Sequence, residues 1–600
     1  MVARESSLGA RAVAHPVTVP QVETDGFSVP EGGAWHEMVS GHPEPRNHFV
    51  KAPMDLTRRH LNGFAVSTLL GARSGMLVRP KSFVSAQPDV SIWHPTDGLR
   101  LAGATQAVAS LDPALARDLP TNFLIRQIFR GLLRFDGGFS VIPELAETMT
   151  VSGDALHYSF VLREGIHFHD GRAVTAADVR ESLSRALRPA TAGGTVEGLT
   201  GLTYLRDIIG AREVLDGSAT MLAGVEVHHE RRLTISIQEP SATFPMKLAS
   251  VPASIVDRVQ IEVDPAWDVR PNGSGPFRCD TFAPQQELVL SPDPGWWAGA
   301  PAMPRVHVRL GPSASQPINL FAAGEIDIVD DVPPEQLDLL RDPASGFDPA
   351  GLIETPLFAV SYIALGNREP PLDDRHIRRA LRLGFPSSMI AEATFDGAVR
   401  SATGLIPDGM LGRNWDVGAM GPDLEAAHAE IRASRYGSAP RVPPIVIHAA
   451  DIAPVETLRD VVERDLGLVI EAVAVNWPDF LGGLAAKAFP AYALYWGADY
   501  PDPESLLWML FGSDSPENYT GYRNDEFDAI LAEARNERDD ALRSQFYEIA
   551  HRLLIEDAAV IPLYGDIAYT AVKRGIDGLT VTPMGLLGLE TIRAGSAHRE

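Results

Sequence analysis

The chain has 600 residues, of which 45% are hydrophobic and 22% are charged. This composition is typical of a soluble globular protein, and the chain is too long for one hydrophobic core, so we expect two or three domains. A net charge of -26 argues against broad electrostatic binding to nucleic acid or anionic lipid, since both need a basic surface.

The N-terminal region, residues 1–97, carries the features of an export signal. Two arginines in Thr57–Leu61 precede the weakly apolar stretch Phe64–Gly71, and Val84-Ser85-Ala86 has the small residues of a cleavage site. The pattern looks like a twin-arginine signal peptide at about residues 54–86, with translation starting at Met54 and the preceding segment untranslated or disordered. A short surface helix with two solvated arginines is the alternative.

Cysteine content excludes two kinds of structure. Cys279 is the single cysteine, so no intramolecular disulfide and no cysteine-rich metal site can form. No cysteine directly follows the apolar stretch, so we expect an exported protein without a lipid anchor. No run of about 18 uncharged apolar residues occurs that would span a bilayer.

Strands and helices alternate along the rest of the chain. The expected strands are Leu99–Gly103, Leu233–Ile237, Leu288–Leu290, Val306–Leu310 and Tyr492–Tyr495. Apolar residues at helical spacing predict a helix over Asn122–Leu133, and a capping-box-like Thr175–Asp178 opens another that ends by Pro189. This interleaving indicates the α/β class.

Two further helices are expected near the C-terminus. Asn524 can cap a helix, and a second helix carries Leu542, Phe546, Ile549 and Leu553 at helical spacing. No repeat with a period of 20 to 50 residues is present, which argues against a solenoid or propeller.

An ordered set of short motifs runs from Phe129 to Tyr564. The motifs are Phe129–Phe135, Val141–Glu147, Phe168–Gly171, Ser274–Phe277, Gly324–Ile328, Asp373–Leu381, Trp496–Glu504 and Ile561–Tyr564. The set resembles the extracytoplasmic solute-binding proteins of family 5, the oligopeptide- and dipeptide-binding receptors of ABC importers.

The resemblance implies a bilobal, type II periplasmic-binding-protein fold with an extra domain inserted in the larger lobe. Chain crossings between the lobes are expected near Gly273–Phe277, near Ser361–Asn367 and after Tyr564. The implied division is residues 98–133, 273–362 and 566–600 for the core of lobe 1, 134–272 for the inserted domain, and 363–565 for lobe 2.

The resemblance also implies that Asp499 pairs with the α-ammonium group of a bound peptide. Asp499 stands three residues after Trp496, as in peptide-binding members, and a carboxylate in a closed cleft forms a charge-assisted hydrogen bond with an ammonium. The alternative is a structural role, in which Asp499 ends the preceding strand and caps the turn at Tyr500-Pro501. Trp496 and Tyr495 offer rigid aromatic surfaces, but neighbouring strand residues face opposite ways, so one of them should face the cleft.

Other candidate ligand contacts lie between residues 400 and 415. Arg400, and after it Arg413, are candidates for the carboxylate end of a peptide, although a solvated surface arginine explains either equally well. Trp415 is a further aromatic candidate in a loop rich in Gly and Asp. For each aromatic residue, packing in the core is an alternative of equal weight.

Metal binding and catalysis find little support. His167, His169 and Asp170 could approach a metal, yet Phe168–Gly171 matches a turn that the family carries in members that bind peptides without metal. The chain has no Gly-x-Ser-x-Gly elbow, His-Glu-x-x-His helix or phosphate loop. We therefore expect neither a metal nor a cofactor, and no enzymatic activity; hydrolysis is the alternative of another class.

The function implied by the resemblance is capture of short peptides by hinge closure for an ABC importer. The expected partners are a membrane permease and an ATPase subunit, with no nucleic acid, and the expected form is a periplasmic monomer. A non-peptide solute, such as an opine, a sugar, a nickel complex or another amine, is the alternative within the binding class. A non-transport sensor or chaperone-like role also stays open.

Overall fold

The computed structural model describes residues 98–595 with short gaps. The gaps are residues 104–107, 117, 138–139, 195–198, 312–315, 343–346, 396, 415–416 and 418–421. Trp415, Met54 and the expected signal peptide lie outside the described residues. None of the helices in the described part of the chain has the length and apolar character that a membrane crossing needs.

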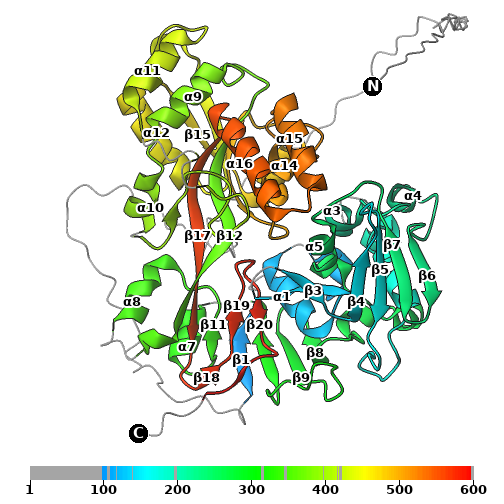
Figure 1. The fold of residues 1–600 in the computed structure, drawn as a ribbon. Helices are drawn as coiled ribbons and strands as arrows, with labels where there is room; N and C mark the ends of the chain where they lie inside the picture. The colour runs from blue at the N-terminus through cyan, green and yellow to red at the C-terminus, as the bar shows by residue number, and fades with distance from the viewer. Residues whose placement is uncertain are drawn as a thin grey trace, which may run out of the picture. The chain divides into compact units, whose positions relative to one another are not determined.

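An 11-stranded mixed sheet runs through the protein in the order β15-β14-β16-β12-β17-β11-β1-β10-β9-β8, with β13 paired to β17 (Figure 1). Parallel pairs join β1 to β10 and β11, and β14 to β15 and β16. The strands are β1 (Leu99–Ala102), β8 (Phe277–Ala283), β9 (Glu287–Pro292), β10 (Val306–Arg309), β11 (Ile328–Val329), β12 (Leu352–Leu365), β13 (Arg400–Ser401), β14 (Ile445–Ala449), β15 (Ile470–Ala474), β16 (Ala491–Gly497) and β17 (Val560–Val572).

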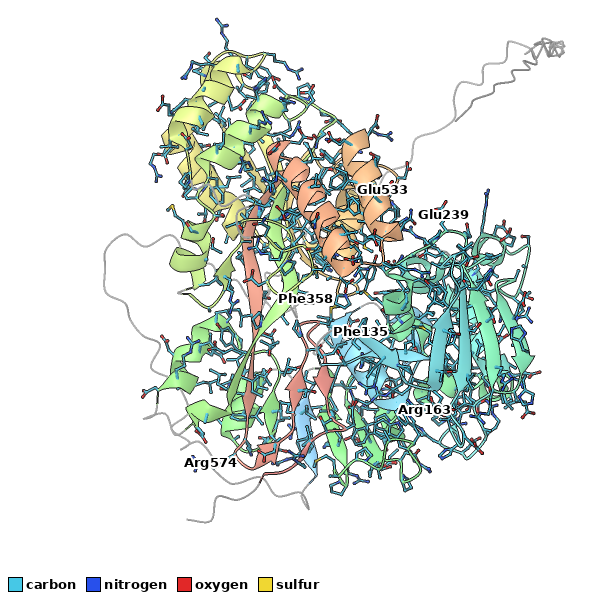
Figure 2. All side chains as sticks on the ribbon, in the orientation of Figure 1. Phe135, Arg163, Glu239, Phe358, Glu533 and Arg574 are labelled. Carbon is cyan, nitrogen blue, oxygen red and sulfur yellow. The ribbon has the colours of Figure 1, made fainter. Side chains whose placement is uncertain are left out.

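The long strands β12 and β17 connect the two halves of this sheet. They pair antiparallel from Leu352↔Ala571 to Ala364↔Val560, with register shifts between Pro356 and Val360 and between Ser361 and Tyr362. Proline lacks the amide hydrogen that a strand ladder needs, so pairing is interrupted there. Phe358, labelled in Figure 2, lies within the first interruption. This break is where we expect the two halves to bend relative to one another.

Side chains on the upper part of β12 alternate between two cores. Ile363 and Leu365 pack with helices α9 (Arg375–Gly384), α11 (Leu424–Ala433) and α12 (Ala453–Leu466). Tyr362 and Ala364 pack on the opposite side with α14 (Glu504–Phe511), α15 (Asp525–Asn536) and α16 (Asp540–Glu556). Because successive strand residues point to opposite faces, both faces of this half of the sheet are covered by helices.

A separate four-stranded antiparallel sheet has the strand order β4-β5-β7-β6, and it lies beside the half of the large sheet that contains β8 and β9 (Figure 1). It has its own core, which includes Phe160, Val179, Leu205, Ile235 and Phe244. Its elements are β4 (Ala146–Val151), β5 (His157–Leu162), α2 (Ala176–Arg185), α3 (Gly201–Leu205), α4 (Ala211–Leu215), β6 (Val225–His229), β7 (Arg232–Ser236) and α5 (Phe244–Leu248). The expected capping box is confirmed, since Thr175 and Asp178 exchange side-chain and backbone hydrogen bonds at the start of α2.

The helix expected over Asn122–Leu133 has different bounds. Helix α1 spans Leu119–Ile128, and Leu133 begins the short strand β2 (Leu133–Phe135), which pairs with β3 (Val141–Pro143). The carbonyl of Ile128 accepts a hydrogen bond from Gly275 N over 2.7 Å instead of continuing the helix. A contact with a segment far along the chain therefore ends the helix early.

Replacing Gly273 by alanine is expected to lower the free energy of unfolding by about 1–3 kcal/mol. A Cβ at this position would overlap the backbone carbonyl oxygen of Ile128, which cannot move without disturbing the end of α1. Gly137→Ala is the matched control, because nothing lies within 4 Å of its added Cβ. Urea denaturation of both variants measures the difference; equal midpoints would contradict the close approach.

Candidate functional site

The end of β16 places the aromatic candidates at the junction of the two halves. Tyr495 pairs with Ser361 and Trp496 with Val360, next to the break in β12. Tyr495 lines a cavity, whereas Trp496 is half-buried and packs against the core that contains Tyr362 and Leu506. The two rings therefore occupy different surroundings, as the alternation of strand side chains requires.

Asp499 follows β16 and meets a residue from the four-stranded sheet unit. Tyr204 of α3 donates a hydrogen bond to Asp499 Oδ1 over 3.1 Å. The second oxygen, Oδ2, is buried and has no hydrogen-bond partner within the described part of the chain. Burial raises the pKa of Asp499 to about 6; the hydrogen bond from Tyr204 opposes this shift and the charge of Glu517 adds to it. The site thus holds an acceptor with spare capacity for a donor, and most of all for a cation.

A buried ion cluster around Glu504 lies close to Asp499 in sequence. Glu504 accepts hydrogen bonds from Arg535 Nε (2.6 Å), from Tyr500 OH (3.1 Å) and from Thr243, while Lys247 Nζ lies 3.9 Å away. Burial alone would raise the pKa of Glu504, but Lys247 and Arg535, helped by Thr243, bring it to about 2. Thr243 and Lys247 come from the end of the four-stranded unit, so this cluster joins that unit to α14 and α15.

A stacked pair of cations extends the same contact. Trp508 on α14 has the guanidinium groups of Arg206 and Arg535 at 4.5 and 4.7 Å from its ring, within cation–π distance. Sequence reasoning missed Tyr204, Lys247, Glu504 and Trp508. No spacing pattern marks them, because the contacts that join the two parts of the chain span up to 295 residues, as between Tyr204 and Asp499.

The two candidate arginines share one carboxylate. Arg413 is buried and donates to Asp408 Oδ1 over 3.0 Å, with further contacts to Thr403. Arg400 lies on β13, 3.2 Å from the other oxygen of Asp408, and its side chain is 51% exposed. Arg413 thus fastens its own loop, and Arg400 is the one of the two with an accessible guanidinium.

Two spaces lie near these residues. The cavity in front of Tyr495 has about 440 Å³ of empty volume and is also lined by Asp451, Trp477 and Tyr564. A larger groove of about 1550 Å³ has the four-stranded unit on one side, where Tyr158 is one of the lining residues. Its other walls include Phe358, Met410 and Arg543. Side chains from both halves therefore enclose space for a ligand.

The histidines of the Phe168–Gly171 turn have protein partners. His169 Nε2 lies 3.1 Å from the Gly275 carbonyl oxygen, and burial lowers the pKa of His169 to about 4. His167 Nδ1 lies 3.0 Å from the carbonyl oxygen of Phe168. Within the described ranges no three His, Cys, Asp or Glu side chains gather as metal ligands. His169 therefore ties the turn to the Ser274–Phe277 segment.

The family follows from comparison with known sequences. The profile described as "Bacterial extracellular solute-binding proteins, family 5 Middle" matches residues 140–518, more than half of the 600-residue chain. The chain belongs to this family. The resemblance drawn from the motifs is confirmed, and with it the reading of the chain as an extracytoplasmic solute-binding protein.

Similar proteins cover most of the chain. It is 26% identical over 489 residues to "Probable di/tripeptide-binding protein 5" of Pseudomonas aeruginosa, which covers 78% of this chain and 89% of that protein. Its fold is similar to that of HbpA2 from Haemophilus parasuis, with a TM-score of 0.71, 23% identity, and coverage of 83% and 100%.

It is also similar in fold to the ABC transporter-associated periplasmic binding protein DppA from Helicobacter pylori, solved in complex with the peptide STSA. There the TM-score is 0.68 and the identity 19%, with coverage of 83% and 98%. The predicted bilobal α/β fold is confirmed.

Proposed function

We propose that this protein captures short peptides between its two lobes and delivers them to a membrane ABC importer. The observation that carries the proposal is Asp499, a half-buried residue at the meeting of the two halves whose Oδ2 is buried and has no partner within the described residues. An α-ammonium group would supply the missing donor and the compensating charge. The di/tripeptide-binding name of the Pseudomonas relative adds support.

The proposed mechanism is hinge closure at the break in β12 and β17. Open lobes admit the ligand, and closure is stabilised by contacts made only in the closed state. The proposed lobes have the bounds given above, with residues 134–272 as the inserted domain. Trp496, Tyr495 and Arg400 remain proposed ligand contacts; Arg413 and Trp415 are weaker candidates, the first because its side chain is engaged by Asp408.

The proposed setting is the periplasm, reached by the twin-arginine route, with a free monomer rather than a lipid-anchored protein. The closed form would dock on a permease whose separate ATPase subunit drives import. The role is binding without chemical change of the ligand.

Native mass spectrometry of the protein purified from its own periplasm, followed by denaturing release, tests the proposal. A ladder of short peptides is the expected result, and its loss in an Asp499→Asn variant would assign the anchor. A single co-purifying non-peptide solute would instead favour the alternative of an opine, a sugar or another amine.

The affinity for trialanine is expected to fall about tenfold between pH 7 and pH 5. Burial raises the pKa of Asp499 to about 6 in the ligand-free protein, against the hydrogen bond from Tyr204 and with the charge of Glu517. The ion pair needs the ionised carboxylate, so affinity is full above this pKa and is lost as the pH falls through it. Calorimetric titration at several pH values measures the change, and Asp499→Asn should abolish it. A flat profile would exclude Asp499 as the anchor.

A further inference from the structure

The cavity in front of Tyr495 has aromatic walls and a carboxylate among them. We call it the aromatic cavity; Asp451, Trp477, Phe480, Tyr495 and Tyr564 line it, and its empty volume is about 440 Å³. Only about 40 Å³ of this space is open to the centre of a water-sized group, so it takes the end of a ligand side chain and not a whole ligand. Asp451 follows β14, and the aromatic residues named above come from β16, β17 and helix α13 (Trp477–Ala485).

One carboxylate oxygen of Asp451 is an acceptor without a partner. Its Oδ1 accepts a hydrogen bond from Ala453 N over 3.2 Å at the start of α12. Its Oδ2 is buried and unpartnered within the described ranges, and so is the hydroxyl of Tyr362, which is 1% exposed and lines the same cavity. Buried polar atoms are rarely left unpaired, so the vacancies point to a donor that arrives from outside the chain.

Two more carboxylates stand beside the aromatic cavity. Asp566 on β17 shares a hydrogen bond with Tyr495 and faces Asp331, which follows β11. Tyr564 lies within electrostatic range of both Asp566 and Asp451. Burial raises the pKa of Asp451, Asp331 and Asp566, the last to about 7, and no lysine or arginine is among the groups that act on them. Asp451 and Asp566 are half-buried and Asp331 is exposed. Carboxyl groups gathered without a counter-charge make this region favourable for cations.

A neighbouring candidate counter-charge, Arg400, is already engaged. Arg400 and Asp566 line one small neighbouring cavity, but the Arg400 guanidinium lies 3.2 Å from Asp408. Aromatic faces add to the preference, since a cation over Trp or Tyr gains cation–π energy. The aromatic walls and the carboxylates thus both favour a cationic group.

We propose that the aromatic cavity binds a basic side chain of the ligand, so that the preferred ligands are short peptides containing lysine or arginine. This inference rests on the proposed function and adds a substrate class to it. Asp451 contacts the cation directly, and Asp566 and Asp331 contribute from the facing half.

The test is calorimetric titration of the purified full chain with a matched set of tripeptides. Lysine, norleucine and glutamate are each substituted at every position of trialanine. At one position the lysine peptide is expected to bind at least about tenfold more tightly than the norleucine peptide, which keeps the length and lacks the charge. Asp451→Asn should reduce this ratio to below about threefold.

Two further variants keep the test decisive. Asp566→Asn should also reduce the ratio, and it covers the case in which Asp451→Asn fails to fold. Asp460→Asn is the matched control: it removes one negative charge from α12, next to Arg459 and outside the cavity lining, and should leave the ratio unchanged. Equal binding of lysine and norleucine peptides would overturn the inference, as would a ratio that survives both aspartate substitutions.

Failure of the proposed function is separable from failure of this inference. If no tripeptide binds, titration with free arginine and with agmatine follows. Binding of either that is lost in Asp451→Asn would reject peptides as ligands and keep the cation-selective cavity, whereas no binding would overturn both.

Discussion

Asp499→Asn is expected to weaken the binding of peptides with a free amino terminus by roughly two to three orders of magnitude. The asparagine keeps the shape and the acceptor for Tyr204, which now lies 3.1 Å from Oδ1. It removes the negative charge that an ammonium group would pair with in a buried setting. Loss of one partner of a buried charge pair costs about 2–5 kcal/mol, much of it from the other charge left unpaired.

Two comparisons separate this effect from a general disturbance of the site. Tyr204→Phe removes only the hydroxyl and should change affinity by less than about tenfold. Wild-type protein should discriminate strongly against amino-terminally acetylated peptides, and Asp499→Asn should bind both forms equally weakly. If Asp499→Asn still prefers the free amino terminus, the ammonium is recognised elsewhere.

Glu504→Ala is expected to lower the free energy of unfolding by about 3 kcal/mol. The change leaves Arg535 and Lys247 without the carboxylate that they share at 2.6 and 3.9 Å. We place the loss at the lower end for buried pairs, because Lys247 keeps Asp207 at 2.7 Å and Arg535 keeps its stacking on Trp508. Urea denaturation of the ligand-free protein measures the loss.

The exposed pair Arg552–Glu548 on α16 provides the control. Its side chains are 55% and 32% exposed, so Glu548→Ala should cost less than about 0.5 kcal/mol. The pH dependence gives a second check. The pKa of Glu504 is lowered to about 2 in the folded protein. The stabilisation from this group is therefore present above the pKa that Glu504 has in the unfolded chain, and it is lost as the pH falls toward 2. A Glu504→Ala loss as small as that of the control would show that the cluster is not stabilising.

Local sequence patterns predicted many elements correctly. The strands at Leu99, Leu233, Leu288 and Val306 and the helix capped by Asn524 are confirmed. Strand alternation and capping depend on residues only a few positions apart, so they can be read from the chain without knowing its fold.

The helix near residue 546 shows where this reasoning fails. Helix α16 exists, but the side chains of Leu542 and Ile549 are 47% and 46% exposed. The buried face instead holds Arg543, Tyr547 and His551. Tyr547 donates to Asp502 Oδ1 over 2.6 Å, and His551 Nε2 accepts from Leu405 N over 2.9 Å. The expected apolar face is therefore wrong at Leu542 and Ile549, whereas Phe546 and Leu553 pack partly buried against the core. Buried partners outside the helix satisfy polar residues that periodicity assigns to solvent.

The candidate site could likewise be predicted only in part from local sequence patterns. The motif around Trp496 and Asp499 was found from the sequence because it lies within one short segment. The engagement of Arg413 by Asp408 and the meeting of Asp499 with Tyr204 follow only from tertiary structure. So does the grouping of Asp331, Asp451 and Asp566 beside one cavity, since these aspartates come from three separate strands or strand ends.

The sequence by itself determined the α/β class and the family, and it nominated Asp499 as the first candidate for the site. Hydrophobic periodicity, capping and ordered motifs are properties of neighbouring residues or of their order along the chain. Only the tertiary structure decided which charges are buried, which are paired, and which oxygens of Asp499 and Asp451 lack a partner. Desolvation and pairing depend on distances between segments far apart in the sequence, and those distances are set by packing of the whole fold.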